Sequence, residues 1–182
     1  MKELPVRKPV RLKGYDYSSA GCYFVTFCVQ DGHELLGEIV GDDAHIVPLK
    51  LAYSEYGATT DQFIKSIDTR YADVFVDKYV IMPNHVHMIL VLKNTSETMK
   101  KEDGTMWASS PTKTSVSSVV RSLKILTAKK CGFSFWQRSF YDHIIRDEAE
   151  YQRIWSYIDQ NPANWKKDRY YKQRGIPCQK KS

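Results

Sequence analysis

Two apolar runs on either side of Pro83-Asn84 give the clearest hydrophobic pattern in the chain. Residues 74–82 (VFVDKYVIM) and residues 85–92 (HVHMILVL) flank this turn-forming pair, so the pattern predicts a β-hairpin. The second run is almost continuously apolar after its histidines, as is typical of a central strand. Residues 21–30 (GCYFVTFCVQ) are rich in β-branched and aromatic side chains and predict another strand that is buried on at least one face.

Helical spacing of apolar residues marks two later segments. Valines and a leucine recur at i, i+3, i+4 and i+7 and predict a helix from about Ser115 to Lys130, with a glycine where a C-terminal cap is expected. Asp147 and Glu150 resemble a capping box at the start of a last helix. That helix is expected to end near Asn161, because Pro162 disfavours helical geometry at the residue before it.

The order of the predicted elements indicates an α+β fold. Residues 35–40 and 44–49 are candidates for short strands, and residues 54–66 show a weaker helical pattern. The coarse order is β-β-α-β-β-α-α, which fits an antiparallel sheet with helices packed on one face. We expect a single domain over residues 1–182, because this length allows a sizeable core without a second domain.

The charge of the chain is unevenly distributed. A net charge of +6 and a pI of about 9.0 are compatible with a polyanionic partner but do not establish one. Basic residues gather in an N-terminal arm (1–13) and a C-terminal tail (166–182), while residues 94–114 lack periodicity and predict a flexible loop. Tyr170 and Tyr171 lie among the cations of the tail, a combination that suits a single nucleic-acid strand. Two solvated, frayed tails are the alternative interpretation.

The cysteines and the ends of the chain exclude some protein classes. The four cysteines form no CxxC pair, which argues against a disulfide framework and a zinc knuckle. The first residues lack the apolar core of a signal peptide, and no run reaches transmembrane length. We therefore expect a cytoplasmic protein with no membrane association.

His85 and His87 are the first candidates for chemistry. Residues i and i+2 of a strand point to the same side, so both imidazoles should lie on one face of the sheet. Histidine is a common metal ligand, and an HxH pair presents two ligands together. Two histidines satisfied by hydrogen bonds at the end of a sheet are the alternative, and a metal site would need a third ligand from elsewhere.

The last helix offers that ligand and a nucleophile. Tyr157 and Asn161 are four residues apart and therefore lie on the same helical face. An amide oxygen from Asn161 could complete a metal site, and Tyr157 would then lie beside the metal. A metal-bound phosphodiester could be attacked by the tyrosine oxygen to give a covalent intermediate. Taken singly, Asn161 could be no more than a helix-end residue and Tyr157 no more than a boundary tyrosine.

Three segments resemble a known family. MPNHVHMILV at 82–91, FWQRSFYDHIIRDEAEYQRIWSYIDQNPANW at 135–165 and GYDYSSAGCYFVTFCVQ at 14–30 resemble the single-tyrosine HUH transposases. This family includes the REP-associated tyrosine transposases and the small insertion-sequence transposases that move as single strands. The resemblance implies a ferredoxin-like α+β sandwich, a divalent ion such as Mg²⁺ or Mn²⁺, and hairpin-forming single-stranded DNA as the partner.

The resemblance also implies roles for individual residues. His85 and His87 match the HUH motif, Tyr157 matches the nucleophile that is joined to the 5′ phosphate, and Asn161 matches the third ligand of the metal. Tyr141 is the rival nucleophile, but it precedes the capped helix and has no amide four residues later. In this family the insertion-sequence enzymes act as dimers and the REP-associated ones can act as monomers, so a homodimer is one of two states implied.

Basic residues of the matched region are candidates for DNA contacts. We expect Arg121, Lys124, Arg138 and Arg146 to bind DNA, with Arg138 and Arg146 as the candidates for phosphate contacts. His143 is expected to be a structural histidine. Two other functions stay open from the residues alone: a nucleic-acid-binding α+β module without chemistry, and a small metallohydrolase that uses the HxH pair.

Overall fold

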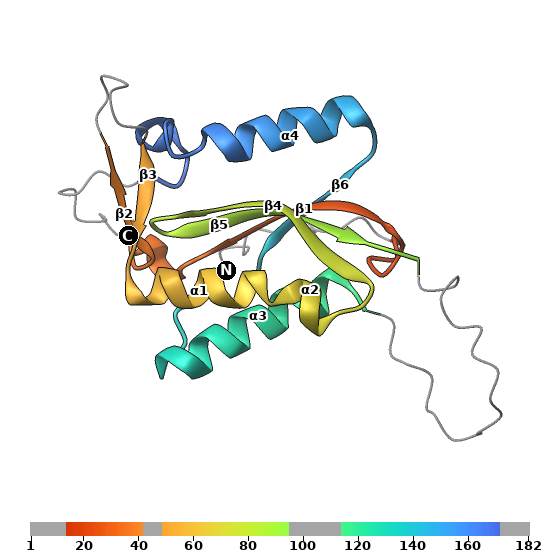
Figure 1. Cartoon of the computed structure of the whole chain (residues 1–182), viewed down its shortest axis with the longest axis horizontal. Coiled ribbons are helices and arrows are strands. Elements are labelled where there is room, and N and C mark those ends of the chain that lie inside the picture. The colour runs from red at the N-terminus through yellow and green to blue at the C-terminus, as the bar shows by residue number, and fades with distance from the viewer. Residues whose placement is uncertain (1–13, 42–48, 95–113, 172–182) are drawn as a thin grey trace, which may run out of the picture.

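The structure is a computed structural model that describes residues 14–41, 49–94 and 114–171 (Figure 1). Its centre is a four-stranded antiparallel sheet in the order β4-β5-β1-β6. The strands of this sheet are β1 (Gly21–Cys28), β4 (Val74–Met82), β5 (His85–Leu92) and β6 (Tyr141–Ile145). The remaining elements are η1 (Gln30–Gly32), β2 (Gly37–Val40), β3 (Lys50–Tyr53), α1 (Glu55–Lys65), α2 (Ile67–Arg70), α3 (Val116–Cys131), α4 (Glu148–Gln160) and η3 (Trp165–Lys167).

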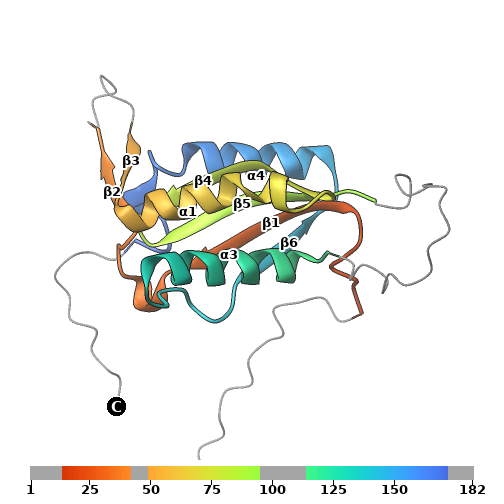
Figure 2. The same cartoon turned by 60° about the horizontal axis from the view of Figure 1, so that its bottom comes forward.

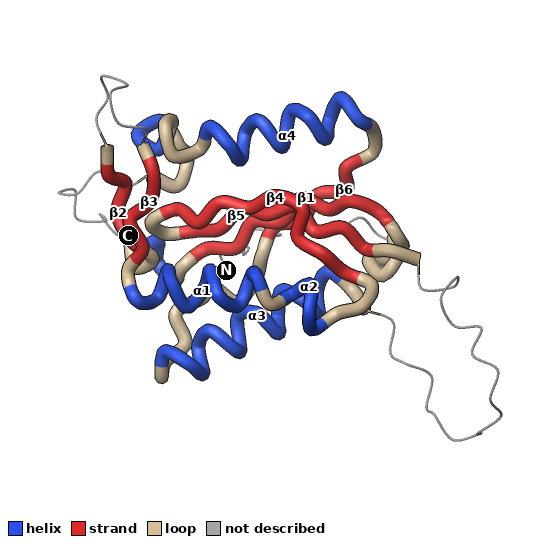
Figure 3. Tube along the Cα trace, viewed as in Figure 1, coloured by secondary structure: helices blue, strands red, loops and turns tan. Residues whose placement is uncertain are grey.

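The helices cover both faces of the sheet. Figures 1 and 2 show α1, α2 and α3 side by side on one face and α4 alone on the other. The tube in Figure 3 shows the same three layers, with the strands in the middle. The paired strands β2 and β3 form a separate small sheet at one end.

The predicted α+β class, with an antiparallel sheet and helices packed against it, is confirmed. The placement of the helices differs from the expectation in one respect, because α4 lies on the face opposite to α1–α3. The central strand β5 explains this difference. Its residues are buried on both sides, with His85 and His87 facing α4 and the alternate residues Val86 and Met88 in the main core. A strand that is apolar on both faces needs cover on both faces.

The main core lies between the sheet and α3. The predicted helix and its glycine cap are confirmed: Val119 and Leu123 are fully buried, and Gly132 ends the helix in the left-handed conformation with φ of 82°. Ser115 caps the start by accepting a hydrogen bond from the Ser118 amide. The core is closed by buried aromatic residues of the segment that follows the helix.

Strand β6 is absent from the sequence-based prediction. It pairs with β1 from Cys22↔Ile145 to Thr26↔Tyr141 and forms one edge of the sheet. Its five residues, YDHII, follow a segment that is tethered to α3. The ammonium of Lys124 on α3 donates to the carbonyls of Gln137 and Ser139 at 2.9 and 2.8 Å. Pairing with β1 and this tether, rather than local pattern, make the segment a strand.

Several predicted segments fall outside the part of the chain that the structure describes. These are the N-terminal arm 1–13, residues 95–113 of the predicted loop 94–114, and residues 172–182 of the tail 166–182. The predicted strand 44–49 also lies outside, except for Leu49, and the partner of β2 is instead Lys50–Tyr53. Within the described ranges, no helix combines the length and apolarity that crossing a bilayer requires.

Candidate functional site

His85 and His87 open β5, directly after the turn at Pro83-Asn84. Alternation along the strand places both imidazoles on the face covered by α4, and both side chains are almost fully buried, at 0% and 1% exposure. The adjacent strand β1 sets Cys28 opposite His85 and Thr26 opposite His87. The pair therefore lies inside the molecule, at the end of the sheet near the turn.

Hydrogen bonds fix the orientation of each ring. His85 Nδ1 lies 2.8 Å from Asn84 Oδ1, and a carboxamide oxygen only accepts, so Nδ1 carries the proton and Nε2 has a free lone pair. His87 Nδ1 shares a hydrogen bond of 2.7 Å with the Thr26 hydroxyl. The two Nε2 atoms face each other at 3.0 Å. They can share one proton or, when both are unprotonated, hold one cation.

Burial keeps both histidines neutral. It lowers the pKa of His85 to about 3, and burial together with the neighbouring His85 lowers the pKa of His87 well below its usual value. Neutral imidazole is the form that binds metal ions. The pair is therefore ready to act as ligands at pH 7 without first losing protons.

Asp168 adds a carboxylate to the histidine pair. One ligand atom from each of His85, His87 and Asp168 lies within 4.8 Å of the others. Asp168 follows the short helix η3. The buried Trp165 of this helix packs near His85, with 6.0 Å between the ring centres, and so keeps the segment close to the site. The amide of Tyr170 donates to Asp168 Oδ1 at 2.7 Å and fixes this carboxylate.

Asn161 lies beside this cluster with an unsatisfied oxygen. Its side chain is 2% exposed, and Nδ2 donates to Asp168 Oδ2 at 3.2 Å. Asn161 Oδ1 is buried and accepts no hydrogen bond from the described residues. A buried acceptor without a partner is destabilising, so this oxygen is suited to an electropositive ligand.

The donor set fits a divalent cation. Two nitrogen ligands at about 2.1 Å from one ion and at right angles to each other lie ~3.0 Å apart. The two imidazole Nε2 atoms have this separation, 3.0 Å. Imidazole nitrogens combined with carboxylate or amide oxygens can bind several divalent ions, so this donor set does not by itself select one of them.

Tyr157 places its hydroxyl at the edge of the cluster. The oxygen lies 3.2 Å from His87 Nε2 and 3.4 Å from Asp168 Oδ2, to which it donates. Burial, followed by the negative charge of Asp168, raises the pKa of Tyr157 to about 12. The residue as a whole is nevertheless 43% exposed, so solvent reaches part of the side chain whose hydroxyl contacts the buried histidine. Tyr157 and Asn161 occupy one helical face, as their spacing predicts.

The rival tyrosine lies on the same face but outside the cluster. Tyr141 on β6 pairs with Thr26 on β1. Strand β1 therefore lies between Tyr141 and the histidines of β5. Tyr141 is 42% exposed, and within the described residues no hydrogen bond joins it to His85, His87 or Asp168. The geometry thus separates the two tyrosines that the sequence leaves as competitors.

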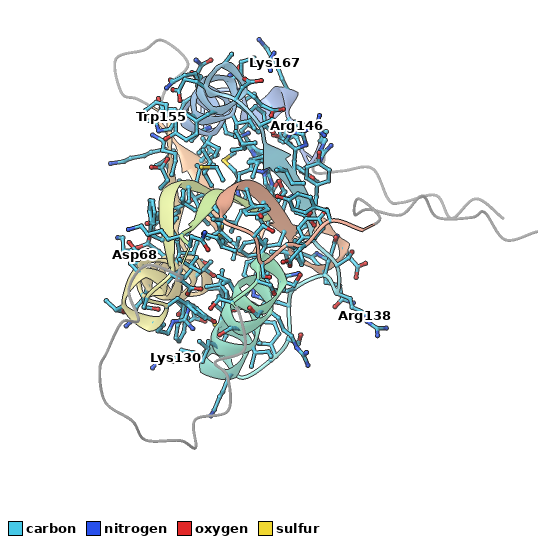
Figure 4. All side chains as sticks on the ribbon, turned by 90° about the vertical axis from the view of Figure 1, so that its right-hand side faces the viewer. Asp68, Lys130, Arg138, Arg146, Trp155 and Lys167 are labelled. Carbon is cyan, nitrogen blue, oxygen red and sulfur yellow. The ribbon has the colours of Figure 1, made fainter. Side chains whose placement is uncertain are left out.

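A bulge in β4 anchors the helix that carries Tyr157. The register of β4 shifts at Asp77, so that Asp77 and Lys78 both reach α4. Asp77 Oδ2 accepts from the Tyr151 hydroxyl at 2.5 Å. Lys78 Nζ lies 2.6 Å from Asp159 Oδ1 and 3.7 Å from the centre of the Trp155 ring, which is labelled in Figure 4. Polar contacts therefore hold much of α4 in place.

A second anchor connects α4 to β6. His143 Nε2 lies 2.7 Å from Glu150 Oε1, and Glu150 Oε2 accepts from the Arg146 amide at 2.9 Å. Asp147 caps the helix by accepting from the Glu150 amide at 2.8 Å. The structure thus gives His143 a helix-positioning contact, as expected for a structural residue.

The four basic residues expected to bind DNA do not gather around this cluster. Figure 4 shows Arg138 and Arg146 well apart, and both are exposed. Arg121 and Lys124 belong to α3, on the opposite face of the sheet from α4. Burial lowers the pKa of Lys124 to about 8, and its ammonium is engaged by backbone carbonyls. Lys124 is thus placed as a tether of the 137–139 segment.

Sequence reasoning missed Asp168, Arg169 and Tyr170 as parts of this site. The Tyr170 ring packs 4.4 Å from the His85 ring, and its carbonyl accepts from Asn84 Nδ2 at 2.8 Å. The Arg169 guanidinium lies 4.6 Å from the centre of the Tyr170 ring. One signal was available, because Asp168 is the single acidic residue of an otherwise basic tail.

Comparison with known proteins identifies relatives of this chain. No family model matches the sequence. An uncharacterized protein of Haemophilus influenzae (strain Rd) is 33% identical over 174 residues, which cover 91% of this chain and 93% of that protein. The chain belongs to the family of this Haemophilus protein. The match spans nearly the whole length of both proteins.

A solved structure shows the same fold. It is that of a REP-associated tyrosine transposase bound to a REP hairpin, with a TM-score of 0.57 and 20% sequence identity. The match covers 85% of this chain and 74% of that one. The predicted resemblance to tyrosine transposases is therefore confirmed at the level of the fold.

Proposed function

We propose that this family member is a metal-dependent strand transferase that cleaves and rejoins single-stranded DNA through a tyrosine-linked intermediate. The observation that carries the proposal is the 3.2 Å separation between the Tyr157 hydroxyl and His87 Nε2. This contact supports the proposal, because the hydroxyl of a partly exposed tyrosine lies against two buried, neutral histidines. A protein that only bound nucleic acid would need neither the neutral pair nor the tyrosine beside it.

His85 and His87 would hold the cation, and Asn161 Oδ1 and Asp168 are the oxygen donors beside them. We propose Mg²⁺ or Mn²⁺ as the ion. When bound, such an ion polarises a phosphodiester and neutralises the charge that develops on it during displacement. Asn84 and Thr26 would keep the two imidazoles oriented through their Nδ1 atoms.

The covalent step uses the Tyr157 oxygen. It attacks phosphorus, the bond from phosphorus to the 3′ oxygen breaks, and that oxygen gains a proton to become a free 3′ hydroxyl. Asp168 Oδ2 lies 3.4 Å from the Tyr157 hydroxyl oxygen and would accept the phenolic proton. The 5′-phosphotyrosine keeps the energy of the phosphodiester, so attack by a 3′ hydroxyl rejoins the strand and restores the tyrosine.

The DNA partner is proposed from the fold and the charge. The tyrosine transposase with the same fold is bound to a REP hairpin. This chain has a net charge of +6, and phosphate neutralisation by basic residues is a large part of DNA affinity. We therefore propose a single strand that folds into a hairpin as the substrate, with cleavage in its unpaired part.

Covalent capture tests the proposal. Purified protein is incubated with Mn²⁺ or Mg²⁺ and labelled single-stranded oligonucleotides that span inverted repeats beside its coding region, and adducts are resolved by denaturing electrophoresis. We expect an adduct that EDTA and Tyr157→Phe abolish and that Tyr141→Phe leaves intact. Cleavage that survives Tyr157→Phe would instead indicate a metallohydrolase that uses water. Tight metal-independent binding without any cleavage would indicate a binding module.

A further inference from the structure

An aromatic surface adjoins the histidine pair on the α4 face of the sheet. Phe24 is at its centre, with its ring stacked 5.3 Å from His87. The rings of Tyr141 and Tyr157 lie edge-on to Phe24, at 6.4 and 6.2 Å. Aromatic side chains from β1, β6 and α4 therefore form one continuous surface beside the candidate metal ligands.

The exposure of this surface is unusual for the molecule. Only five large hydrophobic residues of the described chain are classed as exposed: Tyr53, Ile125, Phe133, Tyr141 and Tyr157. Two of these five flank Phe24. Exposed aromatic surface is common at sites that bind a ligand. Tyr157 is accounted for by its role as nucleophile, whereas Tyr141 has no role in the chemistry proposed above.

The strand register gives the position of Tyr141 relative to the site. Tyr141 and His87 are both paired with Thr26, from opposite sides. Two strand spacings therefore separate their backbones, roughly 10 Å. The Tyr141 ring lies on the same face as the histidines. It is close enough to contact a nucleotide adjacent to one held at the histidines.

A cation borders the same surface. The Arg169 guanidinium lies 6.0 Å from the centre of the Tyr141 ring and 4.6 Å from that of Tyr170. Exposed rings beside a guanidinium are what single-stranded nucleic acid requires, because bases stack on the rings and phosphates pair with the cation. A protein or lipid partner would need neither this spacing from the histidines nor the cation.

We propose that Tyr141, with Phe24 below it and Arg169 at its rim, is a base-stacking subsite for the nucleotide next to the scissile phosphate of single-stranded DNA. The location of that phosphate rests on the proposed function, whereas the stacking itself does not. The proposal gives Tyr141 a binding role through its ring, and its hydroxyl is not required. Stacking has little base preference, so the subsite orients the strand and leaves sequence choice to other contacts.

Binding measurements on a non-reacting background test this subsite. All variants carry Tyr157→Phe, and fluorescence anisotropy with Mn²⁺ compares a (dT)12 strand with a fully abasic 12-mer. Tyr141→Ala should weaken (dT)12 binding roughly 5- to 150-fold, as expected for loss of one base–aromatic stack. Tyr141→Phe should bind as tightly as the parent, because it keeps the ring. Neither change should alter binding of the abasic strand.

Matched variants keep the result interpretable. Tyr53→Ala removes another exposed tyrosine, on β3, and should leave (dT)12 binding unchanged. Tyr141→Leu keeps apolar bulk on β6 but has no ring, so it should lose as much (dT)12 affinity as Tyr141→Ala. It replaces Tyr141→Ala if that variant folds poorly. Equal affinity of Tyr141→Ala and its parent for (dT)12 would overturn the proposal, as would equal losses on the two strands. Absence of a wild-type adduct would overturn the proposed function without changing this binding contrast.

Discussion

Asn84 Oδ1 accepts a hydrogen bond of 2.8 Å from His85 Nδ1, so the turn before β5 sets the orientation of the first histidine of the site. Asn84 is itself fixed, because its amide donates to the carbonyls of Gly32 and Tyr170 at 3.3 and 2.8 Å. The residue that turns the hairpin therefore also joins the last residue of η1 and the C-terminal segment to the histidine pair. Its side chain leaves His85 Nε2 free for a ligand.

Removal of this contact should weaken metal binding. Asn84→Ala is expected to lower Mn²⁺ affinity about 10- to 100-fold, the usual cost of losing a group that orients a metal ligand. Asn84→Asp keeps the acceptor for His85 Nδ1 and should retain more affinity than Asn84→Ala. Isothermal titration calorimetry with Mn²⁺ measures both. Equal affinities for wild type and Asn84→Ala would show that His85 needs no such support.

The bulge of β4 should control the position of Tyr157 through α4. Lys78→Met removes the contacts to Asp159 and Trp155 and should lower the free energy of unfolding by about 1 kcal/mol. Small displacements of a reacting group can slow a reaction by about 100-fold, so the rate of adduct formation should fall far more than DNA affinity does. Lys78→Arg serves as the control that keeps the charge. A loss of affinity with an unchanged rate of adduct formation would argue against positioning.

Lys124 should give the protein a pH-dependent stability term. Burial lowers its pKa in the folded protein to about 8, whereas the unfolded chain has the ordinary value of 10.5. Between these values the unfolded state binds more protons, so the stability of wild type should rise with pH from 8 to 10.5 relative to Lys124→Met. Urea denaturation at several pH values measures this difference. A constant difference would mean that Lys124 stays charged in the fold.

Gly57 should be essential for the packing of α1. A Cβ added there would lie 1.9 Å from the carbonyl oxygen of Leu36, a contact that only a backbone shift could relieve. Gly57→Ala is therefore expected to destabilise the protein by about 3 kcal/mol or more. Gly132→Ala is the comparison, since a Cβ there meets nothing within 4 Å and only the left-handed φ of 82° opposes it, at about 1–2 kcal/mol. Thermal unfolding of both variants should rank them in this order.

Much of the fold follows from local sequence, but β6 does not. The hairpin 74–92 and the helices that begin at Val116 and Glu148 have strong periodicity and caps, and the structure has them close to the predicted bounds. Strand β6 has only five residues and carries Asp142 and His143 in its middle. Its conformation depends on pairing with β1, which is distant in sequence, so no local pattern could identify it.

The site was predictable where spacing alone determines geometry. The i, i+2 spacing brought His85 and His87 together, and the i, i+4 spacing brought Tyr157 and Asn161 to one helical face. Asp168 comes from a segment whose path depends on the packing of Trp165, which is a tertiary property. The surface cations gave no comparable signal, because charge along a chain does not specify which face it will occupy.

Mapping the covalent link tests the central claim most directly. The protein is reacted with Mn²⁺ and a cleavable single strand, the adduct is digested with trypsin and nuclease, and mass spectrometry locates the remaining nucleotide. The account predicts a 5′-phosphate ester on the peptide that contains Tyr157, with a free 3′ hydroxyl on the released DNA fragment. A nucleotide on the Tyr141 peptide, or cleaved DNA with no peptide carrying a nucleotide, would contradict it.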